Sequence, residues 1–119
     1  MSQEFAPGDI LLFQIESGFG LLRLLHIDWH ESDPVWHLMT YEDMFLDEFS
    51  ADDAAKKPEQ LRVGNRHLVL TNRAFFSTQT AKLNNHPVTS EESAMIEEAK
   101  RSGVHEPSDR SVRLLLGLR

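Results

Sequence analysis

Three histidines and one aspartate lie close enough in the sequence to form one polar cluster. His26, Asp28 and His30 alternate along five residues, and His37 follows after a short turn. Alternate residues of a β-strand share one face, so a hairpin would bring His37 next to Asp28. Imidazole and carboxylate groups are the ligands that Zn²⁺ or another divalent transition metal takes in a chain without cysteine. The pattern predicts either a metal-binding protein or metal-dependent enzyme, or simply a solvated hairpin face that carries histidines.

Apolar runs separated by turn residues predict the strands that would hold this cluster. We expect a first strand over residues 9–15 and a second from Phe19 to about Trp29. A turn at residues 31–34, which contains Pro34, would lead into a third strand over residues 35–41. These three strands should form an antiparallel meander.

The apolar residues of the second and third strands predict how these strands pair. We expect Trp29 to lie opposite Trp36 and Asp28 opposite His37, because this register superimposes the apolar faces. His37 would then lie on the outer, solvated face of the hairpin. The two tryptophans together with Tyr41 suggest a further alternative, a site for a small cationic ligand between aromatic rings.

The rest of the chain predicts shorter elements. Thr89 and Glu92 have the spacing of a capping box, and Gly103 is a typical C-terminal stop. The apolar residues within segment 42–49 are spaced in a way that fits a helix or an extended segment equally well. The expected elements are a short helix from Ser50 to about Lys57, a strand over 67–71, a strand or apolar loop over 74–78, a helix over about 90–102 and a last strand over 111–116.

Together these elements predict a single α+β domain over residues 1–119. We expect a small, partly open antiparallel β-barrel of about five or six strands, with one or two short helices. The barrel core would cover about residues 5–80, followed by the helix at about 90–102 and the final strand.

The charge of the chain is unevenly distributed. The net charge is −7, yet residues 1–55 carry twelve acids and a single base, Arg23, whereas residues 56–119 carry seven acids and eleven bases. We expect Arg23 to pair with Asp9 or Glu16 on the neighbouring strand. The acidic half disfavours nucleic acid as a partner and favours a basic protein. The predicted binding surface consists of Asp28, Glu42, Asp43, Asp47, Glu48, Asp52 and Asp53.

Several classes of function lack their sequence signatures. The chain has no cysteine, which excludes disulfides and thiolate chemistry and fits a reducing cytoplasm. We find no signal-peptide pattern, no apolar run long enough to span a bilayer, no nucleophile elbow and no phosphate-binding glycine loop. We therefore expect a cytoplasmic protein without a cofactor, a membrane partner or catalytic residues.

The opening of the chain resembles a known kind of protein. Pro7-Gly8-Asp9-Ile10-Leu11, followed by Gly18-Phe19-Gly20-Leu21-Leu22-Arg23-Leu24-Leu25, is similar to the first hairpin of SH3-like barrel proteins. In particular it resembles a bacterial immunity-protein family, the twenty-sixth in the polymorphic-toxin classification. The resemblance implies a protein-binding module that neutralises a toxin, and it implies no particular functional residue. The leading prediction is therefore a non-enzymatic, protein-binding module that uses its acidic surface.

Overall fold

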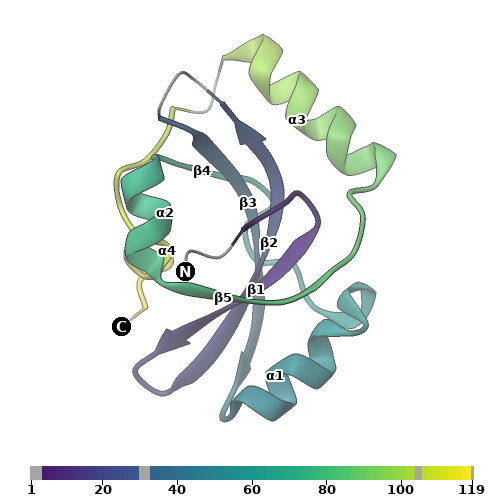
Figure 1. The fold of residues 1–119 in the computed structure, drawn as a ribbon, viewed down its shortest axis with the longest axis vertical. Coiled ribbons are helices and arrows are strands. Elements are labelled where there is room, and N and C mark those ends of the chain that lie inside the picture. Colours follow the sequence, from purple (N-terminus) through teal and green to yellow (C-terminus); the bar gives the residue numbers. More distant parts are fainter. Residues whose placement is uncertain (1–3, 30–32, 104–105, 119) are drawn as a thin grey trace.

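The chain folds around one five-stranded antiparallel sheet (Figure 1). The structure is a computed structural model and describes residues 4–29, 33–103 and 106–118. The strands are β1 (Asp9–Ile15), β2 (Gly18–Asp28), β3 (Val35–Phe45), β4 (Leu68–Leu70) and β5 (Thr80–Asn85). Their order in the sheet is β4-β3-β2-β1-β5, so β4 and β5 form two edges that do not pair with each other in the described chain. The α+β class and the antiparallel sheet are confirmed, whereas the sheet is not closed and an SH3-like barrel is not confirmed.

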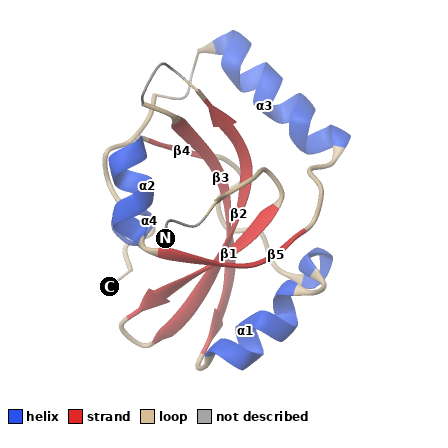
Figure 2. Cartoon of the chain, viewed as in Figure 1, coloured by secondary structure: helices blue, strands red, loops and turns tan. Residues whose placement is uncertain are grey.

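Helices cover both faces of the sheet, as Figure 2 shows. The helical segments are α1 (Glu48–Ala55), the 3-10 turn η1 (Pro58–Gln60), α2 (Asn72–Thr78), α3 (Ser90–Ser102) and α4 (Val112–Leu115). In the view of Figure 2, α2 and α4 lie on one side of the sheet, and α1 and α3 lie on the other. None of the helices in the described ranges is long and apolar enough to cross a membrane.

The sheet separates two apolar cores because alternate residues of each strand face opposite sides. Leu11 and Phe13 of β1 belong to the core beneath α2 and α4, where they join Phe75 and Val112. Ile10 and Leu12, on the other face of the same strand, belong to the core beneath α1. The nearly continuous apolar runs of the first two strands therefore reflect burial on both faces.

The first hairpin and the helix at the end of the acidic half form as predicted, with better-defined ends. The third strand extends to Phe45, which assigns the undecided segment 42–45 to a strand. The following helix begins at Glu48, because Asp47 rather than Ser50 is its N-cap and accepts a hydrogen bond from the Ser50 backbone N–H. The long helix α3 carries the predicted Thr89 capping box and ends at Gly103, whose φ is 64°.

Two predicted strands are wrong and one strand was missed. Residues 74–78 lie in α2, whose first turn is capped by the Thr71 side chain. Residues 111–116, predicted as the last strand, hold the short helix α4, which is capped by Ser111. Only Val112 of α4 is buried, and it packs against Thr78 and the core. The edge strand β5 was not predicted, because it is polar and starts directly after Gln79, whose φ is 56°.

The predicted pairing of β2 with β3 is also wrong. The observed register places His26 opposite His37 and Ile27 opposite Trp36, with an irregularity between Leu24 and His26. An extra residue in one strand of an antiparallel pair forms a β-bulge, which changes the face on which the following residues lie. Trp29 therefore lies beyond the paired region and is 69% exposed instead of facing Trp36.

Candidate functional site

An exposed group of apolar and acidic side chains lies where β3 ends and α1 begins. Leu46 and Phe49 are 88% and 87% exposed, which is unusual for apolar side chains of this size. Four acidic residues of the same short segment, residues 46–53, are exposed as well. We call this surface the acidic–apolar patch, and it consists of Leu46, Phe49, Asp47, Glu48, Asp52 and Asp53.

Local structure explains why the patch is exposed. Asp47 Oδ1 accepts a hydrogen bond of 2.7 Å from the Ser50 backbone N–H, which starts α1 at this point. Hydrogen bonds from the Ser50 backbone and side chain lower the pKa of Asp47, so this carboxylate is charged at neutral pH. The helix then directs Ala51 and Ala55 into the core and leaves Phe49 in solvent.

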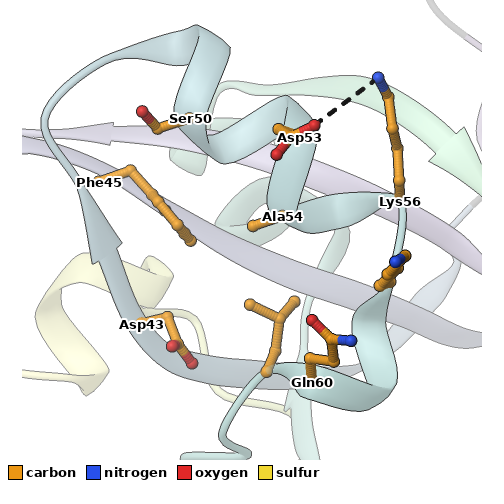
Figure 3. A pocket seen from close by; sticks show the side chains of 9 residues that line it. Asp43, Phe45, Ser50, Asp53, Ala54, Lys56 and Gln60 are labelled. Carbon is orange, nitrogen blue, oxygen red and sulfur yellow. Dashed lines mark ion pairs between the residues drawn. The ribbon is translucent and has the colours of Figure 1, made fainter.

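A hollow of about 520 Å³ adjoins the patch between β3 and α1 (Figure 3). Asp43 and Phe45 project into it from β3, and Asp53 lies across from them on α1. Asp53 forms a 4.0 Å ion pair with Lys56, and Asp43 accepts a hydrogen bond from the Arg62 backbone N–H. The hollow thus has apolar walls and charges of both signs, and it extends the patch towards η1.

Two members of the predicted acidic surface lie elsewhere. Glu42, whose neighbour Asp43 faces α1, lines a hollow with Leu115 and Leu116 on the other face of the sheet. Asp28 is at the end of β2, beside α3, and Lys100 Nζ lies 3.3 Å from its Oδ1 atom. The predicted surface is therefore divided: four of its acids form the patch, Asp43 lies half-buried at its border, Glu42 lies on the other face, and Asp28 belongs to another cluster.

That second cluster contains the histidines that the sequence singled out. His26 Nε2 lies 3.6 Å from Asp28 Oδ1, and His37 Nε2 lies 3.8 Å from Asp28 Oδ2. His37 also shares a 2.8 Å hydrogen bond between its Nδ1 atom and Nε2 of His67. His30, the remaining predicted ligand, is outside the described residues. The sequence did not indicate His67, because it lies thirty residues away from His37 and reaches it only through the pairing of β4 with β3.

Burial determines the charge of this cluster. His37 is only 5% exposed, so it does not lie on the solvated face that the sequence predicted. Burial, together with the neighbouring His67 and His26, lowers the pKa of His37 to about 4. Burial acts to raise the pKa of Asp28, but the hydrogen bond and charge of Lys100 outweigh it and lower that pKa. At neutral pH the cluster consists of a neutral buried imidazole beside a charged and paired carboxylate.

The predicted metal site is only partly assembled. The structure brings His26, Asp28 and His37 together as expected. No group of three histidine or acidic side chains in the described part of the chain is arranged so that it could hold a metal ion. Metal binding by His26, Asp28, His30 and His37 stays a prediction.

The three predicted aromatic residues do not share a site. Trp29 and Trp36 line one hollow, together with Phe5 and Phe76. Tyr41 lies in the core on the opposite face of the sheet, and burial raises its pKa to about 12. Tyr41 therefore does not lie with the two tryptophans, and Phe5 and Phe76 line the hollow beside them instead.

The single base of the acidic half has a structural role. Arg23 is buried and forms a 2.9 Å ion pair with Glu92 of α3. Its guanidinium also donates hydrogen bonds to the backbone carbonyls of Gly8, His86 and Pro87. One side chain thus holds together the start of β1, the segment after β5 and the first turn of α3.

The predicted partners of Arg23 are therefore wrong. Asp9 is fully buried, but it lies 3.2 Å from Lys82 Nζ and accepts a 2.8 Å hydrogen bond from Asn85. These two partners belong to β5, the strand that the sequence did not reveal, and the Ala6 backbone N–H donates a further 2.8 Å hydrogen bond to Asp9 Oδ2. Glu16 is exposed in the turn between β1 and β2.

Comparison with known proteins does not assign this chain to a family. No family model matches the chain, and no curated protein or solved structure shows a significant match to it.

Proposed function

We propose that this chain is a non-enzymatic module that binds a basic partner protein through the acidic–apolar patch. The observation that carries the proposal is the exposure of Leu46 and Phe49 in a segment whose four carboxylates are exposed as well. Exposed aromatic side chains surrounded by a polar rim are typical of the central residues of protein interfaces. The carboxylates would attract a basic partner and orient it as it approaches.

The kind of partner follows from the charge of this half and from the resemblance of the first hairpin. Many bacterial toxins are basic nucleases, and an acidic protein surface complements such a protein. We propose an immunity-like role in the bacterial cytoplasm, in which the patch covers a basic surface of a toxin. The resemblance of residues 7–25 to SH3-like barrel proteins supports a binding module of this class.

The proposal is tested by measuring binding to a panel of purified basic nuclease domains from bacterial toxins. Phe49→Ser should weaken binding at least tenfold, because a central aromatic residue contributes about 2 kcal/mol or more to an interface. Asp52→Lys should mainly slow association and reduce its dependence on salt. Both side chains are exposed, so neither substitution should change thermal unfolding measurably.

A matched control is Glu97→Lys, which makes the same charge change on an exposed position of α3. This variant should bind as the wild type does. Binding that is insensitive to Phe49→Ser, an equal loss in Glu97→Lys, or no binding to any member of the panel would each contradict the proposal.

A further inference from the structure

An aromatic hollow lies at the end of the sheet away from the acidic–apolar patch. Its volume is about 490 Å³, and its lining includes Phe5, Trp29, Trp36 and Phe76. Trp29 is 69% exposed and Phe76 is 51% exposed, so two large rings face solvent at its mouth. Exposed apolar side chains that gather around a hollow are typical of a binding site.

The aromatic wall of this hollow is held in place before any ligand arrives. Trp36 stacks on Phe75 with a centroid distance of 3.9 Å and an interplanar angle of 4°. Its indole N–H donates a 2.9 Å hydrogen bond to Asn72 Oδ1, which fixes the ring along the strand. Phe5 and Phe76 meet Trp36 edge-on, at 83° and 84°. The rings of Phe5, Trp36 and Phe76 therefore lie in different planes, and Trp36, which is 4% exposed, is a fixed and nearly buried part of the lining.

The charges around the hollow favour a cation. Among the described residues that line it, Glu4 is the only ionisable one. Aromatic faces carry negative potential, and a carboxylate at the rim adds to it. The lining offers few hydrogen-bond acceptors, because the side-chain oxygen of Asn72 already accepts from Trp36. A cation that needs no hydrogen bonds suits such walls better than a primary ammonium group does.

We propose that the hollow formed by Phe5, Trp29, Trp36 and Phe76 binds a small molecule that carries a quaternary ammonium group. The methyl groups of the ligand lie against the rings of Trp29 and Phe76, and its positive charge faces Glu4. This site is separate from the acidic–apolar patch, and the proposal does not depend on the partner protein proposed above.

The test is a titration with choline, followed by tryptophan fluorescence and by the indole N–H signal of Trp29 in NMR spectra. The neutral isostere 3,3-dimethylbutan-1-ol, which has the same shape without the charge, is titrated in parallel. Choline should bind about tenfold more tightly than the isostere, because cation–π attraction is of that order at partly desolvated sites. Trp29→Ala should abolish choline binding when it is followed by the indole N–H signal of Trp36, which lines the same hollow. Glu4→Gln should weaken choline binding while leaving the isostere unaffected.

Phe49→Ala is the matched control, since Phe49 is an exposed ring of the acidic–apolar patch. It should leave choline binding unchanged, which separates this site from the proposed protein interface. Equal binding of choline and the isostere, no response to choline, or an equal loss in Phe49→Ala would overturn the proposal.

Discussion

His37 should make the stability of this protein depend on pH in a defined window. Its imidazole is buried between His26 and His67, and burial with these neighbours lowers its pKa from 6.5 to about 4. Between about pH 6.5 and about pH 4, the unfolded chain binds a proton at this position and the folded chain does not. The free energy of unfolding should therefore be highest above this window and fall as the pH is lowered through it.

The magnitude follows from the size of the shift. One pKa unit corresponds to 1.36 kcal/mol, so a change from 6.5 to about 4 corresponds to about 3 kcal/mol at most. The carboxylates of Asp28 and Glu92, whose pKa values are lowered, contribute stability above their unfolded values of 3.8 and 4.5. That contribution is lost as the pH falls through their folded values, which is mainly below the His37 window. The two effects can be separated by the pH at which they occur.

The measurement is a series of urea unfolding curves across this pH range for the wild type and for His37→Gln. The variant should be less stable at neutral pH but lose much less stability on acidification. His86→Gln is the control, because it removes another imidazole, at the Ala55 carbonyl, and keeps His37. If the free energy of unfolding of His37→Gln fell with pH as steeply as that of the wild type between about pH 6.5 and about pH 4, the buried imidazole would not be the cause.

Three further substitutions test other parts of the fold. Arg23→Met should destabilise the protein by about 3 kcal/mol in urea unfolding, because it leaves the Glu92 carboxylate without its buried partner. The double variant with Glu92→Gln should recover part of this loss, and full additivity of the two single changes would contradict the ion pair's role. Gly20→Ala should lower the melting temperature and cost about 1–3 kcal/mol, because its Cβ would lie 2.5 Å from the Phe13 ring; an unchanged melting temperature would contradict this contact. Thr89→Ala should remove the capping box, cost about 1 kcal/mol and speed amide exchange in the first turn of α3, whereas unchanged exchange would show that the cap is dispensable.

The strands of the first two hairpins could be predicted from the sequence, but their register could not. The alternation that predicts register was obscured because residues 21–25 are buried on both faces of the sheet. The irregularity between Leu24 and His26 then shifts the pairing of every residue that follows. A bulge of this kind adds one residue to a strand and leaves no clear mark in the hydrophobic pattern.

The short helices show a second limit of prediction from sequence. Segments 74–78 and 111–116 are apolar and short, so their local pattern fits a strand as well as a helix. Thr71 and Ser111 cap the two helices, but neither has the acidic residue three positions later that marked Thr89. Such short helices are stable only because they pack on the sheet, which is information from the tertiary structure.

The candidate site was predicted in its charge but not in its apolar part. The run of acids around residues 42–53 predicts a negative surface, and four of these carboxylates are exposed at the patch, whereas Glu42 is exposed on the other face of the sheet. The exposure of Leu46 and Phe49 depends on where α1 begins, which the Asp47 cap determines. The sequence alone would place both residues in the core, where apolar residues of this size usually lie.

The edge position of β5 has a consequence for the order in which this protein can be completed on the ribosome. The chain emerges from its N-terminus, so β1, β2 and β3 can pair long before Thr80–Asn85 has been synthesised. Until then β1 has one open edge, and the carboxylate of Asp9 lacks Lys82 and Asn85. The early meander therefore carries an uncompensated charge at the place where its outer strand is exposed. Such a charge opposes edge-to-edge pairing between nascent chains, and it becomes buried and paired only when β5 pairs with β1.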